Sequence, residues 1–250
     1  MSKIIAVVNQ KGGVGKTTTS INIASQLASN NQTVLLLDLD PQGNATSGIG
    51  ANKEQSLTTY DVICKALPID QAIQSTHINN LFLLPANSDL AAAEIELVGQ
   101  DQREYALAKG LEGVGYDYVI IDCPPALGLL TINALTAANS VLIPVQAEYY
   151  ALEGLGQLLN TIQMIKQRTN PGLDILGIAL TMYDKRNALS DQVYNELKNY
   201  FGEKMLATVI PRNVRLAEAP SYGKTIYEHD RWSKGARAYK TLTKEIKARA

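Results

Sequence analysis

The chain has 250 residues, of which 46% are hydrophobic and 19% charged, and its formal net charge is −1. This composition is typical of a soluble globular protein with a core, and no apolar run approaches the ~18 residues that a membrane span needs. The two cysteines form no Cys-x-x-Cys pair, which argues against a structural zinc or iron–sulfur site within one chain. The N-terminal apolar stretch is too short for a signal peptide, so we expect a cytoplasmic protein.

Strand-length apolar runs recur along the chain, with helix-like stretches between them. We predict strands over residues 3–9, 33–40, 81–85, 116–122, 140–145, 175–181 and 206–210. Continuous apolar runs are typical of a parallel sheet covered on both faces. Helical spacing marks residues 18–29, residues 152–168 and the last stretch, whereas the Gly-, Asn- and Ser-rich segment 41–60 predicts loop and turn. The pattern predicts a doubly wound, mostly parallel α/β sheet with helices on both faces, in a single domain over residues 1–250.

The charge is distributed unevenly along the chain. Residues 1–184 hold 9 Lys and Arg against 17 Asp and Glu, whereas residues 185–250 hold 14 against 7. A basic C-terminal quarter on a nearly neutral protein indicates a localised anionic partner such as nucleic acid, or else a solvated face of mixed charge.

A glycine-rich loop follows the first predicted strand and precedes a helix. Glycines allow successive backbone N–H groups to point at phosphate oxygens, and the helix N-terminus adds a partial positive charge. Lys16 is expected to reach the β- and γ-phosphates, and the Thr17 hydroxyl to hold Mg²⁺. The usual pattern opens with Gly six residues before this lysine, where the chain has Gln10. We therefore predict a phosphate-loop nucleotide site made of Lys11, Gly12, Gly13, Val14, Gly15, Lys16, Thr17 and Thr18.

Acids end two other predicted strands. Asp38 and Asp40 close the second strand, and Asp122 closes the run Val119 to Ile121. Ligands of such sheets lie beyond the carboxyl ends of the strands, where carboxylates can hold the waters of a bound Mg²⁺. We expect these acids to face the phosphate loop.

Together these segments resemble the ParA/MinD family of ATPases. Residues 11–18 are similar to its deviant phosphate loop, residues 38–46 to switch I of the ParA branch, and residues 122–125 to switch II. Residues 144–146, 148–154 and 210–215 also look like ParA, and the overall pattern is most similar to the short ParA/Soj partitioning proteins.

The resemblance implies a P-loop ATPase that hydrolyses ATP with Mg²⁺ and forms an ATP-dependent homodimer. In that dimer Lys11 would reach the partner's nucleotide, and Asp40 would position the attacking water. Thr17 would bind Mg²⁺ directly, with Asp38 and Asp122 acting through water. Pro211 and Asn213 would lie against the adenine.

The resemblance also implies that the ATP-bound dimer binds double-stranded DNA without sequence preference and is therefore nucleoid-associated. Arg186 and Arg215 match positions implicated in DNA binding, while Arg215 could instead pair with Glu218. The usual partner is a ParB-type (Spo0J-like) centromere-binding protein that stimulates hydrolysis. The chain begins at its first strand, so we expect no N-terminal domain for operator binding.

Several alternatives remain open at this point. A MinD-like membrane-associated ATPase would end in an amphipathic helix, but the last nine residues offer only Leu242 and Ile246 as sizeable apolar groups, so we expect no membrane binding. A nitrogenase-like redox ATPase needs two bridging cysteines, and Cys123 lies too early after Asp122 for that role. Amide-forming synthetases use related loops. The lone Trp232 is expected to anchor the C-terminal segment.

Overall fold

The computed structural model describes residues 2–54, 57–148 and 154–250. Within them, seven strands form one sheet in the order β3-β4-β2-β5-β1-β6-β7, parallel except for β3 against β4. The strands are β1 (Lys3–Val7), β2 (Val34–Asp38), β3 (Gln74–Ser75), β4 (Leu81–Leu84), β5 (Tyr118–Asp122), β6 (Ser140–Gln146) and β7 (Asp174–Thr181). The strand order reverses beside β1, which is where open parallel sheets bind their ligands.

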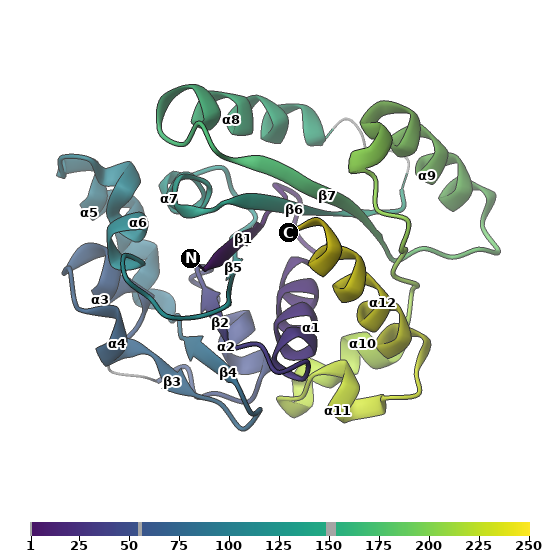
Figure 1. Ribbon diagram of the computed structural model, residues 1–250, viewed down its shortest axis with the longest axis horizontal. Helices are drawn as coiled ribbons and strands as arrows, with labels where there is room; N and C mark the ends of the chain where they lie inside the picture. The colour runs from purple at the N-terminus through teal and green to yellow at the C-terminus, as the bar shows by residue number, and fades with distance from the viewer. Residues whose placement is uncertain (1, 55–56, 149–153) are drawn as a thin grey trace.

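Helices cover both faces of the sheet (Figure 1). The α-helices are α1 (Lys16–Ala28), α2 (Asn44–Gly48), α3 (Thr59–Cys64), α4 (Ile69–Ala72), α5 (Ala93–Glu96), α6 (Ala106–Gly110), α7 (Leu129–Ala137), α8 (Leu155–Arg168), α9 (Ala188–Phe201), α10 (Val214–Glu218), α11 (Ile226–Asp230) and α12 (Lys234–Arg249). Short 3₁₀ helices are η1 (Ser88–Ala92), η2 (Leu97–Gly99), η3 (Arg103–Tyr105), η4 (Gly202–Lys204) and η5 (Ala219–Tyr222). None of the described helices is long and apolar enough to cross a membrane.

The two faces of the sheet build two hydrophobic cores. Successive side chains of a strand point to opposite faces, so Ile5 and Val7 pack with α1 and α12, whereas Ala6 and Val8 pack with α3, α7 and α8. The last helix contributes the stripe expected from its sequence, since Tyr239, Leu242 and Ile246 are all buried. The doubly wound α/β prediction is confirmed.

The predicted strand over residues 206–210 is wrong. Leu206 and Ile210 donate hydrogen bonds to Ile178 and Leu180 of β7, at 3.0 and 2.8 Å, but the amides between them do not join a ladder. The Ala207 and Thr208 amides donate instead to the Glu245 carboxylate on α12, at 2.8 and 3.0 Å. Because the Glu245 carboxylate takes these two amides, residues 206–210 do not form a strand beside β7.

The segment 41–60, predicted as loop and turn, contains α2 and the start of α3. The Asp38 carboxylate accepts hydrogen bonds from the amide and hydroxyl of Thr46, at 2.8 and 2.7 Å, and so fastens α2 to the end of β2. Helix α3 begins with a capping box between Thr58 and Asp61. Both helices depend on particular polar contacts, which a composition rich in small polar residues does not reveal.

Candidate active site

The loop between β1 and α1 forms an open cradle. Gly13 and Gly15 have positive φ angles of 75° and 90°, a conformation that favours glycine. A Cβ added to Gly12 or Gly13 would meet no atom within 4 Å, so nothing in the described protein fills the space in front of them. Helix α1 starts directly after Gly15 with no side-chain cap, which leaves its first N–H groups available to an anion.

Two buried polar residues that the sequence analysis missed brace this loop. Asn9 accepts a hydrogen bond from the Lys11 amide at 2.9 Å and donates to the Pro144 carbonyl at 2.7 Å. From the end of β7, the Thr181 hydroxyl lies 2.8 Å from the Val14 carbonyl. A polar residue at or just after the carboxyl end of a buried strand is the sequence signal that marks both positions.

Lys16 lies under the loop rather than in solvent. Its side chain is buried, and its Nζ donates to the Lys11 carbonyl at 3.1 Å. Burial lowers the pKa of Lys16, while the charges of Asp122 and Asp40 oppose the shift. The buried Lys16 ammonium group has lost much of its hydration, and the oxygens of a bound phosphate could take the place of that water.

Asp38 and Asp122 are register partners on neighbouring strands, at the edge of the sheet that bears the loop. Both carboxyl groups are fully buried, and burial is the main cause that raises the pKa of each. Asp122 accepts a hydrogen bond from the Ser20 hydroxyl at 2.8 Å. Its Oδ2 makes no hydrogen bond of normal geometry among the described residues, although the Thr17 hydroxyl lies near enough to this carboxyl group to oppose the rise of its pKa. An orphaned buried carboxylate oxygen is costly, and its presence indicates that a positively charged group or a polar ligand belongs here.

Asp40 follows on the same segment and is also buried. Its backbone N–H lies 3.2 Å from Asp38 Oδ1, and its own carboxylate accepts from the Gln42 amide at 2.9 Å. The carboxylate is thus tied to the turn that precedes α2. Three of the sequence-predicted acids therefore come together beside the loop, as expected.

Lys11 differs from Lys16 because it points outward. Its side chain is half exposed, and its Nζ forms an ion pair with Glu148 at the end of β6. Residues 149–153, which include the Tyr149-Tyr150 pair of the ParA-like motif, lie outside the described residues.

A cavity of about 300 Å³ opens beside the loop, toward the C-terminal segment. Pro211 and Asn213 line it together with Gly15 and Thr18, which lie in the phosphate loop and at the start of α1. Asn213 also caps α10 through a hydrogen bond from the Arg215 amide at 2.9 Å. A mostly apolar cleft that adjoins a phosphate cradle has the character of a site for a planar base.

Comparison with known proteins identifies the family. The family described as "AAA domain" matches residues 2–175. The chain is 55% identical to the sporulation initiation inhibitor protein Soj of Bacillus subtilis strain 168, over 99% of both chains. The chain belongs to the ParA/Soj family of chromosome-partitioning ATPases.

Two solved structures that are similar to this ParA/Soj chain contain a bound nucleotide. A structure described as cobyrinic acid a,c-diamide synthase of Mycobacterium smegmatis, with bound ADP and magnesium, is 40% identical and has a TM-score of 0.85, over 98% of this chain and 93% of that one. An ATP complex of Cyanothece McdA is 25% identical with a TM-score of 0.89, over 99% and 96% of the two chains.

The two arginines predicted to bind DNA lie on the surface of this ParA/Soj protein. Arg186 is 86% exposed and forms a two-bond ion pair with Asp184 at 2.8 and 3.0 Å. Arg215 is 56% exposed and pairs with Glu218 at 2.9 Å, which is the intramolecular alternative expected from the sequence. Such exposed pairs are weak and can be exchanged for phosphate. Lys185, Arg186, Arg212 and Lys234 line one depression of about 590 Å³.

Proposed function

We propose that this ATPase is a single-domain DNA-partition protein that binds ATP and Mg²⁺, forms an ATP-dependent homodimer and binds double-stranded DNA without sequence preference. The observation that carries the proposal is the open phosphate cradle beside the buried pair Asp38 and Asp122, one oxygen of which lacks a partner. Hydrolysis, stimulated by a ParB-type partner, would reset the cycle and so segregate a chromosome or plasmid origin. The proposed location is the nucleoid.

The residues present fit Mg²⁺. This ion prefers oxygen ligands, keeps several waters and takes one or two carboxylates together with substrate phosphates. Asp122 Oδ2 is free to accept from a metal-bound water, and Asp38 lies in register beside it. We assign direct binding to the Thr17 hydroxyl and binding through water to Asp38 and Asp122. When bound, the ion would neutralise charge on the transferred phosphoryl group.

The catalytic roles follow from position and charge. Phosphoryl transfer depends mainly on positioning and on electrostatic stabilisation. Lys16, held under the loop, is assigned to the phosphates of its own subunit, and Asp40 to positioning the attacking water. Lys11 is assigned to the nucleotide of the partner subunit, which requires that it leave Glu148. Pro211 and Asn213 are assigned to the adenine.

DNA binding without sequence preference needs only neutralisation of phosphates. Arg186 and Arg215 are assigned to it, because both are exposed and held by weak surface ion pairs. Dimerisation would place two copies of each arginine on one assembly. Once one copy is bound to DNA, the second is held close to it, which strengthens overall binding. Because the dimer is proposed to need ATP, DNA binding would need ATP as well.

Binding to an unrelated DNA duplex tests the proposal, measured by fluorescence anisotropy at several salt concentrations with no nucleotide, ADP or ATP. We expect binding with ATP alone, weakened steeply by salt. Asp40→Ala should keep binding, Lys16→Ala should lose it, and Arg186→Ala should lose at least part of it. Arg168→Ala, on the exposed C-terminal end of α8, is the matched control for lost charge.

Failure to bind DNA in every nucleotide state would overturn the proposal. Pelleting with anionic vesicles in the same assay would then favour the membrane-associated alternative. An ATP-dependent amidation of small carboxylates would instead favour the chemistry named for the Mycobacterium smegmatis structure.

A further inference from the structure

Exposed aromatic side chains gather in one short stretch of the C-terminal region. Among the described residues, four of the eight large hydrophobic side chains that are exposed fall within residues 214–232. Trp232 is 74% exposed and Tyr222 66% exposed. Trp232 therefore does not anchor the C-terminal segment, and that expectation was wrong. Single exposed apolar residues need no explanation, but a concentration of them in one stretch makes that stretch a candidate for interaction.

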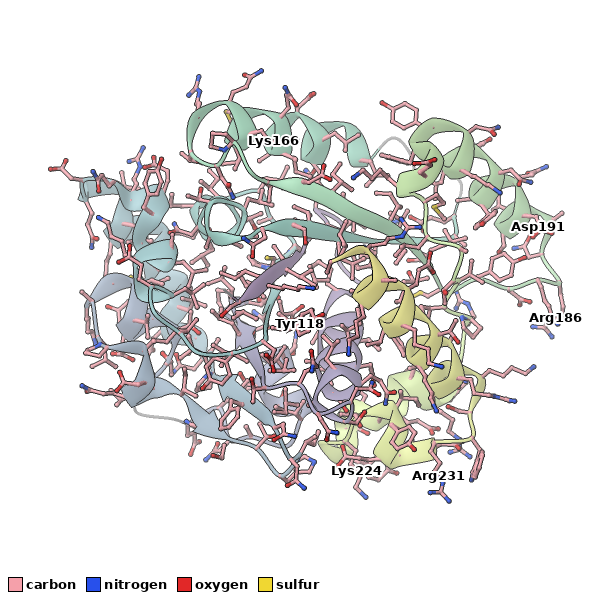
Figure 2. The ribbon with its side chains drawn as sticks, in the orientation of Figure 1. Tyr118, Lys166, Arg186, Asp191, Lys224 and Arg231 are labelled. Carbon is pink, nitrogen blue, oxygen red and sulfur yellow. The ribbon has the colours of Figure 1, made fainter. Side chains whose placement is uncertain are left out.

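Cations accompany these rings. The Arg231 guanidinium lies over the Trp232 indole, 4.9 Å from the ring centroid. Lys224 and Arg231 form no ion pair within the described part of the chain, and Figure 2 shows both at the same rim of the molecule. Residues 212–240 hold seven Lys and Arg against three acids. The surface is therefore complementary to a polyanion.

The acids in this stretch are already engaged. Glu218 pairs with Arg215 at 2.9 Å, and Asp230 accepts from the Trp232 amide at 3.1 Å. Glu228 Oε1 lies 2.8 Å from His77 Nε2. The acids thus hold the local structure, while Lys224 and Arg231 are left for a partner.

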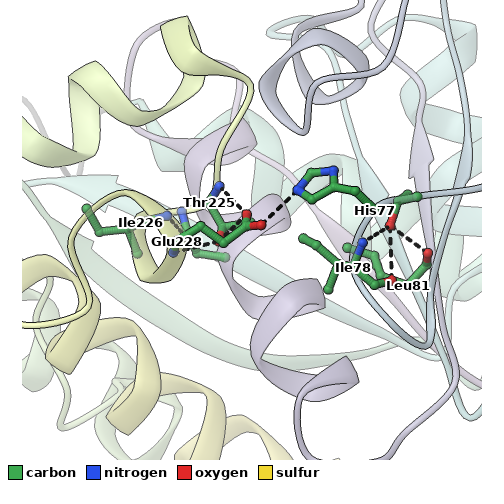
Figure 3. A network of polar contacts seen from close by, with 8 residues as sticks. His77, Ile78, Leu81, Thr225, Ile226 and Glu228 are labelled. Atoms are coloured by element: carbon green, nitrogen blue, oxygen red, sulfur yellow. Dashed lines mark hydrogen bonds and ion pairs between the residues drawn. The ribbon is translucent and has the colours of Figure 1, made fainter.

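The stretch is fixed to the nucleotide-binding core rather than suspended from it. The Ile226 amide donates to Asn22 of α1 at 2.9 Å, and Glu228 bridges Thr225 to His77 of the β3–β4 loop (Figure 3). Tyr222 stacks on His229 of α11 with ring centroids 5.2 Å apart. Rings on a braced support lose little further freedom when a ligand binds.

We propose that Arg231 and Trp232, with Tyr222 nearby in sequence, form a stacking subsite for unpaired nucleic-acid bases. The proposal rests on the proposed DNA-binding function, which it deepens. Phosphate neutralisation alone explains binding to duplex DNA and gives no role to exposed aromatic rings. Aromatic side chains beside cations stack on the base faces of single strands without sequence preference, and a duplex hides those faces. The protein accordingly binds single-stranded or gapped DNA more tightly than a continuous duplex with the same number of phosphates.

The chain has one tryptophan, so intrinsic fluorescence reports directly on this subsite. The probes are a single-stranded oligothymidine, a duplex with the same number of phosphates, and inorganic polyphosphate. We expect oligothymidine to quench the emission of Trp232 and polyphosphate to leave it unchanged. Trp232→Ala should weaken binding to oligothymidine about tenfold and binding to duplex far less. Trp232→Phe, which keeps a ring, should restore most of the affinity.

Tyr200→Ala, which removes an exposed ring from α9, is the matched control and should change neither affinity. The subsite is overturned if oligothymidine binds without changing the emission, or if Trp232→Ala binds it as well as the wild type. It is also overturned if polyphosphate, anionic vesicles or ATP alone produces the same change, since these would indicate charge, lipid or a second copy. Loss of duplex binding would overturn the proposed function alone, because quenching by oligothymidine tests the subsite separately.

Discussion

At the scale of single residues, the electrostatics of the site depend on two buried carboxyl groups. Asp38 and Asp122 lie in register, and burial raises the pKa of both. A carboxyl group whose pKa is raised on folding contributes least to the stability of the folded state at high pH. Above its folded pKa the group must become a buried carboxylate, which costs free energy. Without a bound cation, burial therefore favours the protonated form of both carboxyl groups.

Asp122→Asn tests the raised pKa of Asp122 in protein free of magnesium and nucleotide. Below the unfolded pKa of about 4 the two proteins should be similar in stability. As pH rises from about 4 to about 8, between the unfolded and the folded pKa of Asp122, the free energy of unfolding of the wild type should fall, by about 1.4 kcal/mol for each unit by which the pKa is raised. The variant should show a flatter profile in urea unfolding. Equal slopes for the two proteins would contradict the assignment.

A second prediction at this scale concerns the hydroxyl group of Thr181. Its buried hydroxyl lies 2.8 Å from the Val14 carbonyl and 3.2 Å from the Val145 carbonyl. Thr181→Val should lower the free energy of unfolding by about 1–2 kcal/mol and weaken nucleotide binding, because it leaves the phosphate loop unbraced. Thr181→Ser keeps the hydroxyl and should bind nucleotide nearly as the wild type does. Calorimetric titration with ADP would compare the three proteins, and equal affinity for the Val and Ser variants would show that the brace is dispensable.

At the scale of elements, α7 is held at its start by a residue from another helix. Glu94 of α5 accepts hydrogen bonds from the amides of Leu129 and Leu130, at 2.8 and 3.2 Å. Helix α7 follows the segment 122–125 that resembles switch II. A carboxylate at a helix N-terminus also interacts favourably with the helix dipole.

Glu94→Ala should therefore expose the start of α7. We expect the free energy of unfolding to fall by about 1 kcal/mol and hydrogen exchange to accelerate at Leu129 and Leu130. Glu96→Ala, on the same helix but bonded to Tyr60, serves as control. Unchanged exchange at the start of α7 would mean that the cap contributes nothing.

Another contact between elements joins the turn after α2 to the C-terminal segment. Gly50 and Gly223 meet backbone to backbone, and a Cβ on Gly223 would lie 2.7 Å from the Gly50 Cα. Gly223 also has a φ of +63°. The contact leaves no room for any side chain.

Gly223→Ala should consequently destabilise the protein by more than the ~1 kcal/mol that a left-handed alanine costs. Gly113→Ala is the matched control, since Gly113 has a φ of +78° but a Cβ there would meet no atom within 4 Å. The difference between the melting temperatures of the two variants isolates the contact. Equal melting temperatures would show that the two backbones separate freely.

At the scale of the whole molecule, the Lys11–Glu148 ion pair within one subunit competes with the contact that Lys11 is proposed to make across the dimer. The pair is half exposed, so it contributes at most about 1 kcal/mol. Glu148→Ala frees Lys11 for the nucleotide of a second subunit. We expect the ATP-dependent dimer to tighten up to about fivefold in analytical ultracentrifugation. Lys11→Ala should abolish the gain, and a weaker dimer for Glu148→Ala would contradict the role assigned to Lys11.

The sequence by itself determined the α/β class, the phosphate loop and the acids that face it. These features are local: apolar runs make buried strands, and strand ends in a parallel sheet share one edge, so Asp38 and Asp122 were expected at that edge. That they are register partners follows from the pairing of β2 with β5, which the sequence does not show. The basic C-terminal quarter was also readable, because charge is additive along a chain.

The tertiary structure alone decided the contacts between distant segments. Glu245 draws residues 206–210 off the sheet edge, Thr181 and Asn9 brace the loop, and Trp232 points to solvent. The three hydrogen-bonded contacts depend on which polar group a neighbouring element brings within reach. The exposure of Trp232 depends on how much of its surface the neighbouring elements cover. No local pattern encodes that choice, since buried polar groups take whichever partner the packing brings within reach.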